Sequence, residues 1–189
     1  MNHQGTKTIE TERLILRKFR LEDAPAAFRN WTSDERVTEF LRWPTHKEPA
    51  VTERVIADWV ADSEKPDFYQ WAIVLKSLGE PIGTISVVDM NEKLDILHIG
   101  YCIGSKWWRQ GITSEAFRAI IPYLFREVGA NRIEAWHDPN NPNSGAVMKK
   151  CGLTYEGTLR QADYSNKGIV DACVYSILRS EWEARQKTE

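Results

Sequence analysis

A basic, glycine-containing segment between a predicted strand and a predicted helix could bind phosphate. Lys106, Arg109 and Gly111 follow the β-rich run 94–103, and apolar residues at helical spacing begin just after them. The first backbone N–H groups of a helix have no partner inside it, and the helix dipole adds partial positive charge there. We therefore predict that residues 110–113 seat a pyrophosphate, with Gly111 allowing close approach or a positive φ. An ordinary strand-to-helix turn uses the same residue types, so both interpretations stay open.

Two further segments carry polar side chains suited to chemistry. His98 lies in the same predicted strand, and an imidazole accepts protons near pH 7, directly or through water. Its alternation with apolar neighbours is equally typical of a histidine packed within a sheet. Pro142 favours the first position of a helix, which makes Asn141 a well-formed N-cap and puts the Ser144 hydroxyl at the third helical position.

Strands and helices in mixed order must position these residues. The patterns predict strands at 13–19, 71–75, 82–89, 94–103, 133–137, 153–156 and 169–178. They predict helices at 21–31, 52–63, about 112–128 and 142–151. Pro122 should kink the third of these helices. Propensity alone gives an α/β or α+β fold.

Length and composition favour a single domain. The 189 residues, 42% of them hydrophobic, can bury one substantial core. We expect one domain over residues 9–184, with mobile polar tails at 1–8 and 185–189. The formal net charge of −2 argues against general nucleic-acid binding, which usually requires a basic surface.

The cysteines, histidines and apolar runs predict a cytoplasmic protein without a metal. Cys102, Cys151 and Cys173 are odd in number and lack CxxC spacing, as expected for buried thiols in a reducing compartment. The four histidines show no recurring ligand spacing. No run of residues has the character of a signal segment or approaches the roughly 20 apolar residues that span a bilayer, so we expect no membrane partner.

Two blocks of the sequence resemble motifs of the GNAT N-acetyltransferases, in particular the RimJ/RimL-like branch, which acetylates protein N-termini including those of ribosomal proteins. Residues 107–116, WWRQGITSEA, resemble the coenzyme A pyrophosphate loop (Arg/Gln)-x-x-Gly-x-(Gly/Ala), with Trp108 at its first position and Thr113, a departure, at its last. Residues 138–153, DPNNPNSGAVMKKCGL, resemble the Asn-x-x-Ser segment of the branch. Together with 11–17, 156–160 and 175–178, the resemblance covers about residues 11–182.

The resemblance implies a fold, a reaction and a set of cofactor contacts. The fold is a mixed α/β (α+β) arrangement with a central, mostly antiparallel twisted sheet of about seven strands, splayed between the fourth and fifth strands and flanked by about four helices. The reaction is direct attack of a primary amine on acetyl-CoA in a ternary complex. The implied contacts to acetyl-CoA come from the backbone of the fourth strand, the pyrophosphate loop and the following helices: Ile99, Tyr101, Ile103, Trp108, Arg109, Gln110, Gly111, Ile112, Thr113, Asn141 and Ser144.

The same resemblance assigns catalytic and acceptor-binding roles. Ser144 would protonate the leaving thiolate, although a thiol with a pKa of about 8.5 leaves readily without much help. His98 stands where many relatives place Glu before Ile-Gly-Tyr, so it is either the general base or a core histidine. Trp43 and His46 lie in the segment that borders the acceptor pocket in relatives.

The acceptor is constrained only by amine chemistry. An α-amine with a pKa of about 8 is far more often neutral near pH 7.4 than a lysine amine with a pKa of about 10.4, which suits weak base catalysis. A protein or peptide N-terminus is therefore the first choice, ahead of a polyamine, an amino acid or an antibiotic amine. Transfer of a longer acyl group, a non-catalytic CoA-binding sensor and a homodimer remain alternatives.

Overall fold

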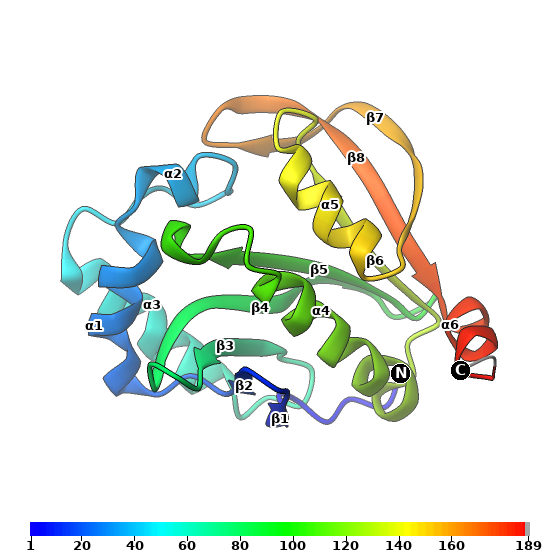
Figure 1. The fold of residues 1–189 in the computed structure, drawn as a ribbon, viewed down its shortest axis with the longest axis horizontal. Helices are drawn as coiled ribbons and strands as arrows, with labels where there is room; N and C mark the ends of the chain where they lie inside the picture. The colour runs from blue at the N-terminus through cyan, green and yellow to red at the C-terminus, as the bar shows by residue number, and fades with distance from the viewer. Residues whose placement is uncertain (188–189) are drawn as a thin grey trace.

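One mixed sheet of eight strands, in the order β1-β2-β3-β4-β5-β6-β8-β7, organises residues 1–187, the part of the chain that this computed structural model describes (Figure 1). Its strands are β1 (Ile9–Glu10), β2 (Leu14–Arg17), β3 (Gln70–Leu75), β4 (Glu80–Asn91), β5 (Ile96–Ile103), β6 (Arg132–His137), β7 (Thr154–Ser165) and β8 (Gly168–Leu178). The helices are α1 (Ala24–Ala27), α2 (Glu35–Thr38), α3 (Pro49–Asp62), α4 (Ile112–Tyr123), α5 (Pro142–Lys150) and α6 (Arg179–Gln186). The expected mixed fold is confirmed, with the two-residue β1, the short α2 and the C-terminal α6 beyond the expected numbers.

Apolar cores cover both faces of the sheet because side chains alternate along a strand. On one face, Leu97 and Ile99 of β5 pack in a core that also holds Phe117 of α4. On the other, Cys102 of β5 belongs to a core with Ile56 of α3. Figure 1 shows α4 and α5 in front of the sheet. Successive residues of β5 therefore face two different helical layers.

The sheet separates between β5 and β6. These two strands pair in parallel only over residues 96–98 and 132–134, whereas every other neighbouring pair is antiparallel. Beyond this short ladder, β5 continues to Ile103 paired with β4 alone. Because β1 precedes the first predicted strand, β5 and β6 are the predicted fourth and fifth strands, and the expected splay between them is confirmed.

Several element boundaries differ from the prediction for local reasons. The α3 helix begins at Pro49 rather than at residue 52, because proline is well suited to the first helical position. Residues 21–32 form a 3₁₀ turn, α1 and a π-helical turn in succession rather than one helix. After Pro122, α4 passes into a π-helical turn over Leu124–Val128, so the helix loses α geometry there.

The β7 strand is far longer than the predicted 153–156. It runs for 12 residues, most of them exposed, and two register shifts interrupt its pairing with β8. An edge strand that is solvated on both faces has no apolar alternation to reveal it.

The first eight residues are held against the domain rather than free as expected. The Gly5 amide donates to the Pro66 carbonyl at 2.6 Å, and the buried Thr6 Oγ1 accepts from the Gln70 amide at 2.8 Å. At the other end, α6 extends to Gln186, so part of the expected second tail is helical. The end of that predicted tail, residues 188–189, lies outside the described residues.

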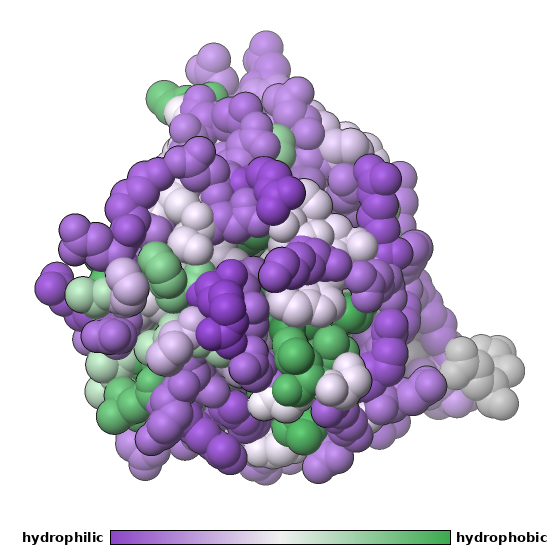
Figure 2. Space-filling view, turned by 60° about the vertical axis from the view of Figure 1, so that its left-hand side comes forward, coloured by the Kyte–Doolittle hydropathy of each residue, from purple (hydrophilic) through white to green (hydrophobic). Residues whose placement is uncertain are grey.

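The surface is largely hydrophilic on the face that Figure 2 shows, where hydrophobic residues gather in small separate groups. Among the described helices, none is long and apolar enough to span a membrane.

Candidate active site

The separation of β5 from β6 leaves backbone groups of β5 facing a gap. The Gly104 amide donates to the carbonyl of Ile82 in β4 at 2.8 Å. Because every second residue of an antiparallel ladder faces its partner, Ile99, Tyr101 and Ile103 direct their backbone groups away from β4. Ile99 stands at the end of the ladder with β6, and the other two lie beyond it. This edge can pair with an extended, amide-bearing ligand such as a pantetheine arm.

Tyr101 and Ser144 meet on the side of the gap that α4 and α5 cover. The Tyr101 hydroxyl oxygen lies 3.0 Å from the Ser144 carbonyl oxygen and 3.0 Å from Ser144 Oγ. Its ring packs against Phe117, with 5.7 Å between centroids. Burial raises the pKa of Tyr101 despite the opposing hydrogen bond with Ser144, so the phenol stays protonated at neutral pH. The tyrosine side chain thus positions the serine hydroxyl.

His98 faces the other side of the sheet, since it is out of phase with Tyr101 along β5. Its Nδ1 lies 3.6 Å from Glu134 Oε1, and its ring lies 4.9 Å from the ring of Trp136. The His98 imidazole and the Arg132 guanidinium lower the pKa of Glu134 against the opposing effect of burial. The carboxylate therefore lies on the Nδ1 side of the imidazole ring. Glu134 and Trp136 were not predicted as site residues.

One cavity of about 380 Å³ is lined by residues from both sides. Its wall includes His98, Tyr101 and Ser144, so the structure brings both predicted catalytic residues to a single space. Burial raises the pKa of Cys102, which also lines the cavity, to about 12, so this thiol is not a nucleophilic thiolate. The remaining lining residues come from the loop after α2, from α3, from the four central strands, from the loop between β6 and α5 and from the β7–β8 hairpin: Phe40, Leu41, Arg42, Trp43, Trp59, Gln70, Thr84, Ser86, Val87, Val88, Ile99, Gly100, Trp136, His137, Asp138, Asn141, Asp163, Tyr164, Ser165 and Val170.

The predicted phosphate seat is the N-terminus of α4. Gly111 is the N-cap residue with φ 75°, a conformation that favours glycine, and the Glu115 amide is bonded to its carbonyl at 3.0 Å. The preceding amides, from Ile112 and Thr113 onward, have no partner within the helix. The Ile112 side chain is buried in the core, so only its backbone can meet a phosphate. Arg109 is exposed and adopts φ 61°, so the predicted basic contact lies in the tight part of the loop.

A brace from the turn between β1 and β2 supports this loop, and the sequence did not reveal it. Arg13 Nη1 donates to the Gln110 carbonyl at 2.9 Å, and Arg13 Nε donates to Glu115 Oε2 at 2.7 Å. The Thr11 hydroxyl donates to the other oxygen of Glu115 at 2.6 Å. Burial would raise the pKa of Glu115, but these hydrogen bonds and the guanidinium outweigh it and lower the pKa. The contacts join residues about a hundred positions apart, which no local pattern predicts.

The side chains of two other loop residues donate hydrogen bonds to nearby backbone carbonyls. The exposed Trp108 donates from Nε1 to the Ile103 carbonyl at 2.9 Å, which occupies one of the backbone groups predicted to meet the cofactor. The Gln110 side chain donates to the Lys106 carbonyl at 2.9 Å.

Of the two predicted acceptor-binding residues, the structure places only one in the cavity. Trp43 lines it. His46 is instead buried beside Thr52, with its Nδ1 2.8 Å from Thr52 Oγ1, and burial lowers the pKa of its imidazole. A loop histidine therefore serves as a packed internal residue here.

Asn141 also departs from its expected structural role. It is the N-cap residue of α5, but its side chain makes no capping hydrogen bond. The side chain lines the cavity instead, which leaves the amide available to a ligand.

The tip of the β7–β8 hairpin is fastened over the outer end of the cavity. Asn166 Nδ2 donates to the carbonyls of Thr38 and Trp43, each at 2.8 Å. Arg42 Nη2 lies 2.7 Å from Asp163 Oδ1 in the hairpin. These contacts make the hairpin part of the acceptor side of the site, a role that its exposed sequence did not indicate.

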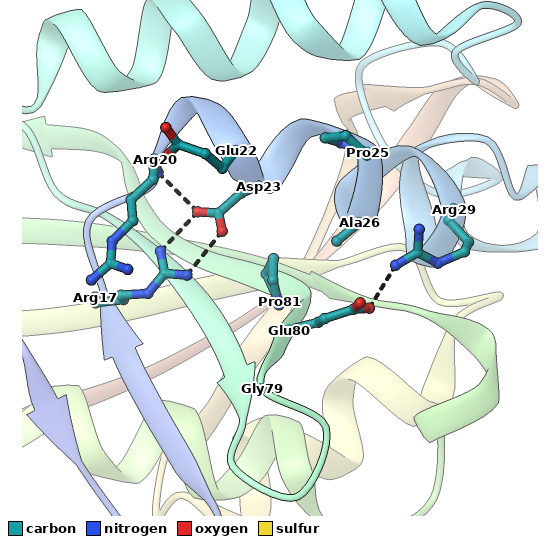
Figure 3. Close-up of a pocket in the computed structure, with 10 residues that line it drawn as sticks. All are labelled: Arg17, Arg20, Glu22, Asp23, Pro25, Ala26, Arg29, Gly79, Glu80 and Pro81. Carbon is teal, nitrogen blue, oxygen red and sulfur yellow. Dashed lines mark hydrogen bonds and ion pairs between the residues drawn. The ribbon is translucent and has the colours of Figure 1, made fainter.

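A second depression, of about 470 Å³, lies near α1 and contains none of the predicted site residues (Figure 3). Its charged groups largely neutralise one another. The guanidinium of Arg17 points at the carboxylate of Asp23, with contacts of 2.7 and 2.8 Å, and Arg29 reaches Glu80 at 2.6 Å. We interpret this depression as structural. Within residues 1–187, no three His, Cys, Asp or Glu side chains are grouped as a metal site would need.

Comparison with known proteins identifies the family. The model of the acetyltransferase (GNAT) domain family matches residues 13–154. The uncharacterised N-acetyltransferase YoaA of Bacillus subtilis is 33% identical over 171 residues, covering 90% of this chain and 96% of its own. The uncharacterised N-acetyltransferase p20 of Bacillus licheniformis is 30% identical over 176 residues, covering 93% and 98%.

Two further comparisons concern one solved structure and one enzyme with a named activity. The crystal structure of a GNAT-family acetyltransferase from Bacillus anthracis superposes with a TM-score of 0.81 at 26% identity, covering 93% of this chain and all of that one. The ribosomal protein uS5-alanine N-acetyltransferase of Escherichia coli is 38% identical over 60 residues, 32% of this chain and 31% of its own. By its family match, its full-length relatives and its splayed sheet, the chain belongs to the GNAT family of N-acetyltransferases.

Proposed function

We propose that the protein transfers an acetyl group from acetyl-CoA directly to a primary amine, and that the acceptor is the α-amine of a protein or peptide N-terminus. One observation carries the proposal: a single cavity is lined both by Ser144, on one side of the sheet, and by His98, on the other. Direct transfer needs a group on each side of the reacting carbonyl, one for the amine proton and one for the leaving sulfur.

The residues of the gap divide these two tasks. His98 takes the proton of the attacking amine on Nε2, directly or through water, while the carboxylate of Glu134 holds Nδ1. Ser144, held by Tyr101, donates its hydroxyl proton towards the leaving sulfur. Acetyl-CoA supplies the activated thioester on which the amine acts.

The cofactor contacts proposed here use backbone more than side chain. The backbone groups of Tyr101 and the backbone amide of Ile103 pair with the pantetheine arm, and the amides at the start of α4 hold the pyrophosphate. Arg109 adds charge at the same loop, and the free Asn141 amide contacts the arm from α5.

An α-amine acceptor is supported by chemistry and by a relative. A weak or water-mediated base favours the amine that is more often neutral at physiological pH, which is the α-amine. The partial similarity to an enzyme named for acetylating the alanine of a ribosomal protein agrees with this choice.

Release of free thiol from acetyl-CoA tests the proposal. The acceptors are N-terminal peptides, polyamines, amino acids and aminoglycosides, with His98→Ala and Ser144→Ala alongside. His3→Ala and the exposed Ser180→Ala serve as matched controls because neither lines the cavity. Release with peptides that the first two variants slow and the controls do not would support the proposal.

Other outcomes distinguish the alternatives. Release only with a small-molecule amine would move the acceptor to that class. Use of succinyl-CoA but not acetyl-CoA would indicate a longer acyl donor. CoA binding without release from any acceptor would contradict an enzymatic role and favour a sensor.

A further inference from the structure

Two residues that line the cavity each carry a buried polar atom without a hydrogen-bond partner. Within the described residues, the buried side-chain nitrogens and oxygens that lack a partner are Trp31 Nε1, Trp136 Nε1 and Asp138 Oδ2. Trp31 belongs to the core beneath α1 and α3 and lines neither of the two cavities described above. Trp136 and Asp138 both line the cavity between β5 and β6.

A donor and an acceptor left unpaired in the same wall are unusual, because burying a polar group without a partner is unfavourable. Trp136 Nε1 can only donate, and a carboxylate oxygen can only accept. The other Asp138 oxygen is already used: Oδ1 accepts from the amide and the side chain of Asn140 at 2.8 and 3.0 Å. Asp138 is therefore held in place by one oxygen while the second remains available.

One of the two residues, Trp136, lies beside the proposed base. Trp136 and Asp138 are two residues apart at the end of β6, and the Trp136 ring packs against the His98 ring at 4.9 Å. An amine that reaches His98 therefore passes the same wall. A ligand that satisfies both atoms must offer a hydrogen-bond donor to the carboxylate and an acceptor to the indole.

We propose that Trp136 and Asp138 recognise an α-amino carbonyl unit, the amine donating to Asp138 Oδ2 and the adjacent carbonyl oxygen accepting from Trp136 Nε1. This inference rests on the proposed function and adds the reason for its acceptor class. A peptide N-terminus carries an amine and a carbonyl separated by one carbon, whereas a polyamine carries donors and no acceptor for the indole.

The charges of the cavity favour a neutral carbonyl over a free carboxylate. The carboxylate of Asp138 repels a second one nearby. Arg42, the lining arginine, is bound to Asp163, with 2.7 Å between Nη2 and Oδ1. A free amino acid therefore lacks a cation to bind its carboxylate, while a peptide or an amino-acid amide does not need one.

The test compares two amines on one variant. Trp136→Phe removes the indole N–H and keeps an aromatic ring beside His98. We expect kcat/KM for phenylalaninamide to fall about 5- to 10-fold, the usual size of one hydrogen bond, and that for 2-phenylethylamine, which lacks the carbonyl, to change less than 2-fold. Trp31→Phe is the matched control, because it removes an equally unpaired indole N–H outside the cavity and should change neither.

Asp138→Asn gives the complementary result. Both amines donate an N–H, so both should lose activity together. Equal responses of the two amines to Trp136→Phe, or equal use of them by the unmodified protein, would overturn the inference and leave the proposed transferase activity intact.

Binding separates the inference from the activity on which it rests. Calorimetric titration of phenylalaninamide into the protein with CoA present needs no turnover. Weaker binding of the amide by Trp136→Phe, with 2-phenylethylamine unaffected, would support recognition even if no acetyl transfer occurred. Absence of amide binding would refute it.

Discussion

Replacing Tyr101 with Phe removes one buried hydroxyl and leaves the ring against Phe117. That hydroxyl has one proton, and the Ser144 carbonyl can only accept. If both contacts of 3.0 Å form together, Tyr101 donates to the carbonyl and the Ser144 hydroxyl donates to Tyr101. The Ser144 proton then faces the tyrosine until the reaction turns it towards the sulfur.

The cost of the change follows from these two bonds. A neutral hydrogen bond contributes about 0.5–1.5 kcal/mol net to stability, and the Ser144 carbonyl also belongs to the backbone of α5. We therefore expect Tyr101→Phe to lower the free energy of unfolding by about 1–2 kcal/mol, which lowers Tm by about 2–8 °C for a chain of this size.

A double-mutant cycle with Ser144→Ala isolates the pair. We expect a coupling energy of about 0.5–1.5 kcal/mol in urea unfolding. Because burial raises the pKa of Tyr101, the coupling should not change between about pH 6 and pH 9. Tyr164→Phe, at an exposed tyrosine, controls for loss of a phenol.

The cycle also bears on catalysis. Tyr101→Phe should lower kcat less than Ser144→Ala does, because the serine hydroxyl remains but is no longer held. Strictly additive stability effects would refute the pairing, and an unchanged kcat in both variants would refute the assignment of Ser144.

The remaining predictions concern the loop brace, an ion pair and a close contact. Arg13→Ala should raise KM for acetyl-CoA about 3- to 10-fold with kcat little changed, because the pyrophosphate loop loses a hydrogen bond; an unchanged KM would contradict the brace. Hydrogen bonds from Arg132 hold the pKa of Glu156 at about 2. Because the pKa of Glu156 is lower in the folded state, its ionised carboxylate stabilises the fold above the ordinary pKa of 4.5, and this stabilisation is lost as the pH falls towards 2. Glu156→Gln should therefore lower the free energy of unfolding by about 1 kcal/mol at pH 7, after allowance for exposure, and by little at pH 2, as measured by urea unfolding. A Cβ added at Gly145 would lie 2.5 Å from His137 Nε2, so Gly145→Ala should destabilise by about 1–3 kcal/mol despite its better helix propensity, and an unchanged Tm would show that the ring moves freely.

Features with a local signal were predictable from the sequence. The start of α4 combines a strand, a glycine and a periodic helix, and its N-cap glycine has the positive φ that was allowed for. The direction of the β5 backbone at Tyr101 and Ile103 followed from the expected splay of the sheet. These features depend on a few consecutive residues or on the shared fold.

Features made by residues far apart in the chain were not predictable. His98 and Glu134 are neighbours only because β5 and β6 pair in parallel there. Asn166 reaches Thr38 across 128 positions. The resemblance placed His46 at the acceptor pocket, whereas the structure buries it beside Thr52. A single sequence carries no record of such contacts.

The half-paired strand at the gap has a consequence for isotope exchange in heavy water. Gly104, and by alternation Cys102 and Gly100, bond to β4, while the amides of Tyr101 and Ile103 point into the gap. Deuterium should therefore enter β5 at every second amide and leave the intervening ones protonated for much longer. A ligand that pairs with this edge would erase the alternation, so exchange rates along five consecutive residues would report its arrival without any chemical reaction.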